Sequence, residues 1–357
     1  MSVLFTPIRL RDLETRNRIW VSPMCEYSCD DADGLANDWH LVHLGSRAVG
    51  GAGLVMTEAA AVTADGRISR YDLGIWSGAH AEALRTTAQF IEAHGAAPAI
   101  QLAHAGRKSS TARPWAGGKP VLPDDEGGWE PSGPSALAYA PGYAEPHAYT
   151  TAEVRAVIDA FAAAAARSAD AGFRAVEIHS AHGYLLHQFL SPLSNQRTDE
   201  YGGDFDGRTR LALDVVRAVR DSFPRELPVL VRISASEYVE GGWGLDDSVE
   251  LACRMKAAGV DLVDCSSGGN SPQQQLKVYP GYQVPFARAI RERAGVATGA
   301  VGLITAPEQA ESIVASGEAD VVLMGRELLR DPYWPLHAAR TLRAEIEWPK
   351  QYQRARL

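Results

Sequence analysis

The chain has 357 residues, of which 46 % are hydrophobic and 22 % charged, proportions typical of a soluble globular protein. Its formal net charge of −9, without a lysine- or arginine-rich block, argues against a nucleic-acid partner. No apolar run of about 18 residues predicts a membrane span, and no charged-then-apolar leader predicts secretion. The four cysteines form no CxxC pair, so we expect a cytoplasmic protein.

Short apolar or β-branched runs recur along the chain, several of them just after a glycine. A glycine is favoured past a helix end, and a short apolar run after it is typical of a buried parallel strand. In chain order, the eight candidate strands are Arg18–Val21, Gly53–Met56, Ala99–Gln101, Arg174–Ile178, Val229–Arg232, Val260–Asp264, Val296–Gly299 and Asp320–Leu323. Capping-box spacing predicts helix starts at Thr150, Asp247 and Thr305, each followed three residues later by a glutamate.

Alternating strands and helices indicate an α/β fold with a parallel sheet. Eight such units favour a single (β/α)8 TIM barrel, with residues 1–357 as one domain. No GxGxxG motif follows the first strand, which weakens a dinucleotide-binding alternative. The segment Thr111–Tyr149, rich in Pro, Gly and Trp, follows the third strand. It is too long for an ordinary loop, so we expect an excursion that caps the barrel mouth.

The functional site of such a barrel lies at the carboxyl ends of its strands. At the end of the fourth strand, His179, His182 and Tyr184 follow one another closely. Two imidazoles can donate hydrogen bonds to one substrate oxygen, and a phenol can deliver a proton. Glycine-rich loops after the last two strands, with Arg326, suggest a phosphate site. Taken singly, a structural histidine or an ordinary tight turn would explain each feature.

A metal-dependent barrel hydrolase is the main alternative from the residues alone. Histidine is a common zinc ligand. Glu177 lies two residues before His179, so the two side chains share one strand face, and His182 follows closely. Spacing alone therefore leaves a metal site open. This hypothesis predicts a colourless, zinc-containing protein.

Several separate motifs resemble the old yellow enzyme family, in particular its bacterial branch that includes xenobiotic reductases. The resemblance extends from Leu4 to Arg354. The motifs that carry it are Asn17–Ile19 with Ser22–Cys25, Gln101–Arg107, His179–Tyr184, Asn195–Gly203 and Gly325–Leu329. Because these motifs are specific and occur in the family's order, together they are stronger than any one of them.

The resemblance implies non-covalent FMN. Ser22 to Cys25 would contact the flavin from the first strand, Ala59 and Gln101 its polar edge, and Arg232 its N1 and O2 region. Cys25 would tune the flavin's redox potential and not act as a nucleophile. The cofactor-binding residues implied in this way are Ser22, Pro23, Met24, Cys25, Ala59, Gln101, Arg232, Gly302, Gly325, Arg326 and Arg330.

The resemblance also implies a reaction. NADPH, with NADH as the alternative donor, would reduce the flavin, which passes hydride to the β-carbon of an activated alkene such as an enone, enal, maleimide or nitro compound. His179 and His182 would hold the substrate's oxygen, Tyr184 would protonate the α-carbon, and Tyr27 would line the substrate pocket. The tail 345–357 resembles one whose arginine, here Arg354, reaches a neighbouring subunit. We therefore expect a homo-oligomer, either a dimer or a tetramer.

Overall fold

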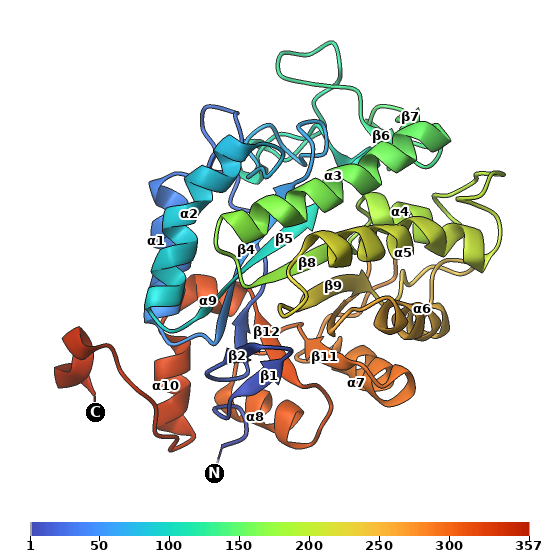
Figure 1. Ribbon diagram of the computed structural model, residues 1–357. Coiled ribbons are helices and arrows are strands. Elements are labelled where there is room, and N and C mark those ends of the chain that lie inside the picture. The colour runs from blue at the N-terminus through green and yellow to red at the C-terminus, as the bar shows by residue number, and fades with distance from the viewer. Residues whose placement is uncertain (1, 357) are drawn as a thin grey trace.

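The computed structural model describes residues 2–356. Eight parallel strands close a barrel in which the last strand pairs with the first. In chain order they are β3 (Ile19–Val21), β4 (Leu54–Ala61), β5 (Ala97–Ala103), β8 (Ala175–Ser180), β9 (Val229–Ser234), β10 (Leu262–Ser266), β11 (Ala297–Ala300) and β12 (Val321–Met324). The predicted (β/α)8 barrel is confirmed, and each candidate strand overlaps one of these eight (Figure 1).

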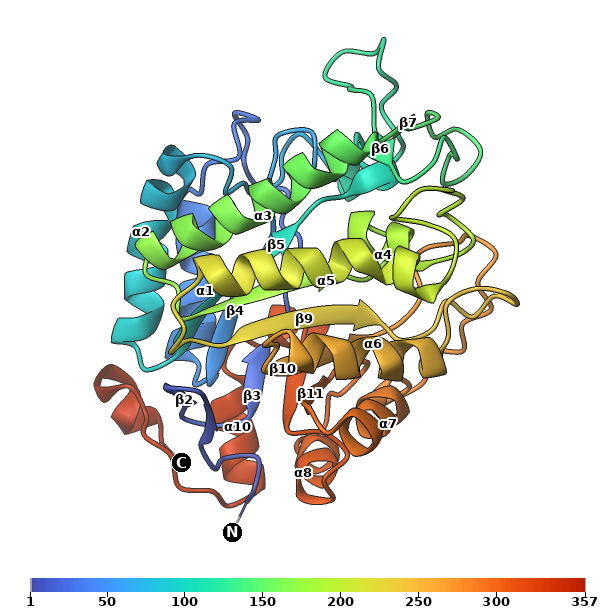
Figure 2. The same ribbon diagram turned by 45° about the vertical axis from the view of Figure 1, so that its right-hand side comes forward.

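Helices surround the barrel on its outside (Figures 1 and 2). The longer ones are α1 (Asp38–Val49), α2 (Gly78–Ala93), α3 (Thr151–Asp170), α5 (Phe205–Ser222), α6 (Leu245–Ala257), α7 (Val284–Ala294), α8 (Pro307–Ala315) and α10 (Trp334–Thr341). Two short helices, α4 (Leu185–Leu190) and α9 (Arg326–Arg330), follow the ends of β8 and β12. Because they start at carboxyl ends of strands, both lie where the site is expected.

Helix α3 shows how the sequence encodes these elements. Thr150 Oγ1 accepts a hydrogen bond from the Glu153 N–H, and the Thr150 N–H donates to Glu153 Oε2, so the predicted capping box is present. Val154, Val157 and Phe161 then form the start of one buried stripe at helical spacing. This stripe places α3 against the outer face of the barrel.

The other two predicted helix starts are wrong in position. Helix α6 begins after Gly244, and the Asp247 side chain accepts a hydrogen bond from the Gly244 N–H instead of serving as the cap residue itself. Helix α8 begins at Pro307, after the cap residue Ala306. Proline has a fixed φ suited to the first helical position, so it sets this start in place of Thr305.

The inside of the barrel changes character along its axis. Its amino-terminal half is an apolar cluster that includes Trp20, Leu54, Leu230 and Leu262. The hairpin formed by β1 (Ile8–Leu10) and β2 (Leu13–Thr15) covers this end, and its Leu13 belongs to the same cluster. Two residues further along β9 and β10, on the same strand faces, charged side chains replace the apolar ones.

The segment Thr111–Tyr149 lies against loops that follow β4 and β5. Trp129 Nε1 donates to the carbonyl of Asp65 at 2.9 Å, and the Tyr149 hydroxyl lies 3.2 Å from His104 Nε2. The segment includes the two-residue strands β6 (Ser132–Gly133) and β7 (His147–Ala148), which pair with each other. It therefore covers part of the barrel's carboxyl end, the position expected of a cap. Within residues 2–356, no helix is both long and apolar enough to cross a bilayer.

Candidate active site

A cavity of about 310 Å³ opens at the carboxyl ends of β3, β9, β10, β11 and β12. It brings together most of the residues predicted to bind the cofactor, along with one of the two predicted substrate histidines. These predicted residues are Ser22, Pro23, Met24, His182, Arg232, Gly302, Gly325, Arg326 and Arg330. Residues that follow β3, near the start of the chain, and β12, near its end, therefore line the same cavity, because these two strands pair with each other.

Cys25, Ala59 and Tyr27 form a group beside this cavity and do not line it. The Cys25 thiol lies next to the Ala59 backbone, and the Tyr27 side chain lies next to Cys25. Burial raises the pKa of the Cys25 thiol well above 9.0, and the nearby carboxylates of Asp72 and Glu58 raise it further. Cys25 is therefore a neutral thiol near pH 7, and a thiol is a weaker nucleophile than a thiolate.

A buried charged layer lies below the cavity. Gln101 Nε2 donates to Glu177 Oε1 at 2.7 Å, and Arg232 Nε lies 3.1 Å from Asp264 Oδ2. Burial raises the pKa of Glu177, and the neighbouring Asp264 raises it further while Arg232 opposes the rise. Glu177 therefore holds a proton more readily than an exposed glutamate would. The Arg232 guanidinium is the positively charged group of this layer, and it also lines the cavity.

Three rings from the end of β8 pack at right angles. The His179 ring centroid lies 5.1 Å from that of His182 and 5.0 Å from that of Tyr184, with interplanar angles of 89°. The Ala181 N–H donates to His179 Nδ1 at 3.2 Å, so the proton of the neutral His179 ring is on Nε2. His182 Nε2 lies 2.7 Å from Ser266 Oγ, which fixes the orientation of the second ring.

The protonation states of these rings follow from their burial. Burial lowers the pKa of His179 and of His182 well below 6.5, and the Arg232 charge lowers both further. Burial raises the pKa of Tyr184 well above 10.0. Near neutral pH, the cluster therefore holds two uncharged imidazoles and one protonated phenol, which are hydrogen-bond donors and a proton source.

Lys108 is a site residue that the sequence reasoning missed. Its Nζ donates to the carbonyl of His182 at 2.8 Å and to that of Gly269 at 2.9 Å. The same atom lies 5.0 Å from the centroid of the Tyr184 ring. Burial, together with the nearby charge of Arg107, lowers the pKa of Lys108 to about 8. The only signal in the sequence was its place directly after the Gln101–Arg107 motif.

Arg354 is not brought to the cavity of its own chain. It lies in an exposed turn of 3-10 helix, Lys350–Ala355, whose Tyr352 ring packs 5.9 Å from that of Tyr333. Figures 1 and 2 show this tail projecting from the barrel beyond α10.

The metal-hydrolase alternative finds no support. Within residues 2–356, no group of three or more His, Cys, Asp or Glu side chains is arranged to hold a metal ion. Glu177, the third ligand that this alternative needed, instead accepts a hydrogen bond from Gln101.

Comparisons with known proteins agree with this geometry. The model of the NADH:flavin oxidoreductase / NADH oxidase family matches residues 3–345. An NADPH dehydrogenase of Geobacillus sp. (strain WCH70) is 48 % identical over 353 residues, which cover 99 % of this chain and 98 % of that protein. An NADPH dehydrogenase of Listeria innocua is 47 % identical, with 99 % of both chains covered.

Solved structures extend the comparison. Morphinone reductase in complex with tetrahydroNAD is 26 % identical, with a TM-score of 0.79 and coverage of 98 % of this chain and 93 % of that one. A 2-naphthoyl-CoA reductase complex is 27 % identical, with a TM-score of 0.86 over 95 % of this chain, which spans about half (52 %) of that longer one. The chain belongs to the NADH:flavin oxidoreductase / NADH oxidase family and is an FMN-dependent NAD(P)H oxidoreductase of the old yellow enzyme type.

Proposed function

We propose that this protein is an ene-reductase, which uses NADPH to reduce the carbon–carbon double bond of enones, enals, maleimides or nitroalkenes. The observation that carries the proposal is the cluster of His179, His182 and Tyr184 beside the cavity, with two neutral imidazoles and a protonated phenol. A protein that only carried flavin would have no need for a proton donor there.

The cavity residues fit FMN. Gly302 has φ +123°, and a Cβ there would approach the side chains of Tyr282 and Gln283 at 3.0 Å, so this part of the cavity wall requires glycine. Gly302, Gly325 and Arg326 would hold the phosphate, with Arg330 at the ring edge. Arg232 would hold the pyrimidine side of the ring, with Ala59 and Gln101 at its polar edge. When bound, FMN supplies the two-electron carrier between NADPH and the alkene.

His179 and His182 would bind the carbonyl or nitro oxygen of the substrate. His179 keeps its Nε2–H available for this purpose, since its Nδ1 already accepts from Ala181. His182 would offer its Nδ1–H, with its Nε2 accepting a hydrogen bond from Ser266 Oγ. Two such donors would withdraw electron density from the double bond and stabilise the negative charge that develops on the oxygen. NADPH and the alkene would use the same pocket in turn, so ping-pong kinetics are expected.

Tyr184 would give its proton to the α-carbon, the step that completes the reduction. The Lys108 ammonium near its ring would favour loss of that proton, because a cation stabilises the phenolate left behind. Tyr27 would line the substrate pocket near Cys25, and the neutral thiol would tune the redox potential of the bound cofactor.

We further propose a homo-oligomer, a dimer or a tetramer, in which Arg354 contributes to a neighbouring site. Its exposure and its absence from the cavity of its own chain favour this arrangement over a role in cis. A solvated tail without function is the competing explanation.

The visible spectrum of the purified protein tests the proposed function. We expect a yellow protein that bleaches when NADPH is added without oxygen and regains its colour when 2-cyclohexenone follows. A protein that stays colourless after incubation with FMN would refute the proposal. Bleaching by NADPH without recovery by any of the four alkene classes would refute the substrate assignment alone.

A further inference from the structure

The turn that carries the substrate-binding groups has an unusual backbone. His182 has φ +57° and Gly183 has φ +73°, so two consecutive residues are left-handed. Side-chain-bearing residues rarely adopt this conformation. A Cβ on Gly183 would overlap the Gly269 carbonyl and lie 2.5 Å from Asn270 Cα, so the turn is pressed against the loop after β10. Such a turn needs specific contacts to hold it.

Side chains of the short helix α4 provide two of these contacts. The Gly183 N–H donates to His187 Nδ1 at 2.9 Å, and Gln188 Nε2 donates to the Gly183 carbonyl at 2.7 Å. From β9, Ser234 Oγ accepts the His182 N–H at 2.9 Å. The backbone of His182 and Gly183 is therefore held by three side chains, those of Ser234, His187 and Gln188. None of these three side chains lines the cavity.

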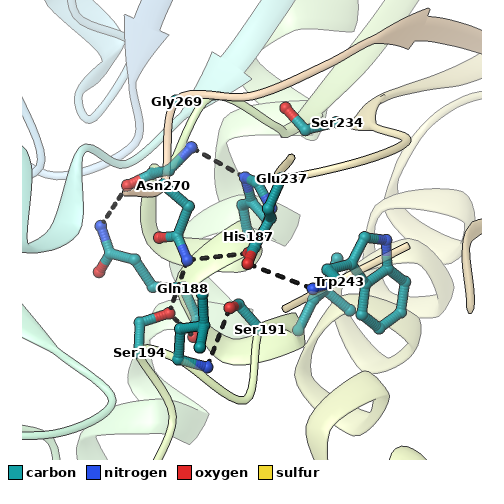
Figure 3. Close-up of polar contacts among 12 residues, drawn as sticks. His187, Gln188, Ser191, Ser194, Ser234, Glu237, Trp243, Gly269 and Asn270 are labelled. Carbon is teal, nitrogen blue, oxygen red and sulfur yellow. Dashed lines mark hydrogen bonds and ion pairs between the residues drawn. The ribbon is translucent and has the colours of Figure 1, made fainter. Parts of the chain in front are cut away.

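His187 is itself held in one orientation and one tautomer. Its ring is fully buried, and its Nε2 lies 3.1 Å from Glu237 Oε1, whose side chain is also fully buried. Because Nδ1 accepts the Gly183 N–H, the proton of the neutral ring lies on Nε2, the nitrogen next to this carboxylate. Glu237 is fixed in turn, since Asn270 Nδ2 donates to its Oε1 at 2.9 Å and the Trp243 N–H donates to its Oε2 at 3.2 Å (Figure 3).

We propose that His187 is a positioning residue for the reaction, with Glu237 fixing its tautomer. It does not line the cavity. It acts through Gly183, holding the His182–Gly183–Tyr184 turn so that the imidazole and the phenol on either side meet the substrate together. This inference rests on the proposed function, because it assigns His187 a part in the alkene step.

Two substitutions separate the two halves of this contact. In His187→Asn, the amide oxygen takes the place of Nδ1 and can still accept the Gly183 N–H, while the contact with Glu237 is lost. In His187→Gln, the amide nitrogen takes the place of Nε2 and can still reach Glu237, while the acceptor for Gly183 is lost. If positioning the turn is the role of His187, the Asn variant keeps more activity than the Gln variant.

The measurement compares two ways of reoxidising the same reduced holoenzyme. The protein is reduced with stoichiometric dithionite and mixed rapidly with either 2-cyclohexenone or dioxygen. Dioxygen needs neither the imidazoles nor the phenol, so its rate reports on the bound cofactor alone. We expect His187→Gln to slow the enone reaction about 10- to 100-fold with an unchanged dioxygen rate, and His187→Asn to restore most of the loss.

A matched control is His80→Asn, since His80 is a buried histidine (4 % exposed) at the start of α2 that lies outside the cavity. It should leave the ratio of the two rates unchanged, even if it lowers thermal stability. Equal ratios in wild type, His187→Asn and His187→Gln would overturn the inference. So would equal loss in both variants, which would indicate general packing.

If neither His187 variant folds and binds FMN, the same two reoxidation rates can be compared in Glu237→Gln, which changes only the carboxylate next to His187 to an amide. It removes the carboxylate that fixes the tautomer, and a smaller fall in the ratio is expected. An unchanged ratio in this variant would overturn the inference. Failure of wild-type protein to react with the enone at all would instead refute the proposed function.

Discussion

The two halves of the barrel interior use the same strands and are equally shielded from water, yet they differ in chemistry. At the amino-terminal end, Leu54, Leu230 and Leu262 fill the barrel with apolar side chains. At the carboxyl-terminal end, the same faces of β8, β9 and β10 carry Glu177, Arg232 and Asp264. Burying charge costs free energy unless it is paired, whereas burying leucine lowers it.

This contrast indicates how stability and function are divided. The amino-terminal half contributes to folding, and the indole N–H of its Trp20 is already paired with Thr15 Oγ1. The carboxyl-terminal half places an arginine at the base of the cavity and two neutral imidazoles above it, although each has a desolvation cost. Changes in the first half should therefore alter stability alone, and changes in the second should alter the reaction first.

The largest effect is expected at the carboxyl-terminal end, from Tyr184→Phe. Loss of a general acid typically lowers a rate by about 10²- to 10⁴-fold. The enone-driven reoxidation of reduced enzyme should fall by that factor, while reduction by NADPH changes little. Tyr201→Phe is a suitable control, because Tyr201 is a buried tyrosine (3 % exposed) that lies outside both the cavity and the ring cluster of His179, His182 and Tyr184. An enone rate within twofold of wild type would exclude Tyr184 as the proton donor.

At the amino-terminal end, Leu54→Ala should show the opposite behaviour. Truncating a fully buried leucine lowers the free energy of unfolding by about 2–5 kcal/mol. The rate per FMN-loaded molecule should be unchanged, as measured by urea unfolding and by steady-state turnover of the same sample. Val42→Ala, at a residue 66 % exposed, should change neither quantity appreciably. Loss of turnover in folded Leu54→Ala would show that the two halves are not separable.

A smaller effect concerns pH. His179 and His182 have pKa values lowered well below 6.5, and the pKa of Tyr184 is raised well above 10.0, so none of them changes charge between about pH 6 and 9. Lys108, with its pKa of about 8, does. As pH rises through 8 it loses the charge that favours proton release from Tyr184, so the enone rate should fall by roughly tenfold.

Stopped-flow rates of enone-driven reoxidation across this range would check the prediction. In Lys108→Met, the rate should be independent of pH and close to the lower rate that the wild-type protein reaches above pH 8. An inflection near 6.5 in the wild-type protein would contradict the neutral state inferred for the two histidines.

Much of this arrangement was predictable, because its signals are local. Each barrel strand is a short apolar or β-branched run, and most of the predicted cofactor residues follow directly from strand ends. The rest depends on contacts between distant segments. The burial of Lys108 is set by the loop around Gly269, and the role of His187 depends on Glu237 from the loop after β9. A lysine after an arginine, or a histidine in a short helix, gives no sign of this.

The smallest expected effect is at the tail, which lies outside both halves of the barrel. If Arg354 reaches a neighbouring subunit, Arg354→Ala should raise the KM for the alkene about fivefold with little change in kcat, since one exposed charge at the edge of a site contributes modestly. Arg356→Ala is a matched control, because it removes an equally exposed arginine two residues away. Truncation after Pro349 should reproduce the Arg354→Ala effect, and light scattering would give the oligomeric state of each variant. Unchanged KM and unchanged assembly in all three would mean that the tail has no part in the site, and that each barrel binds its substrate with its own residues alone.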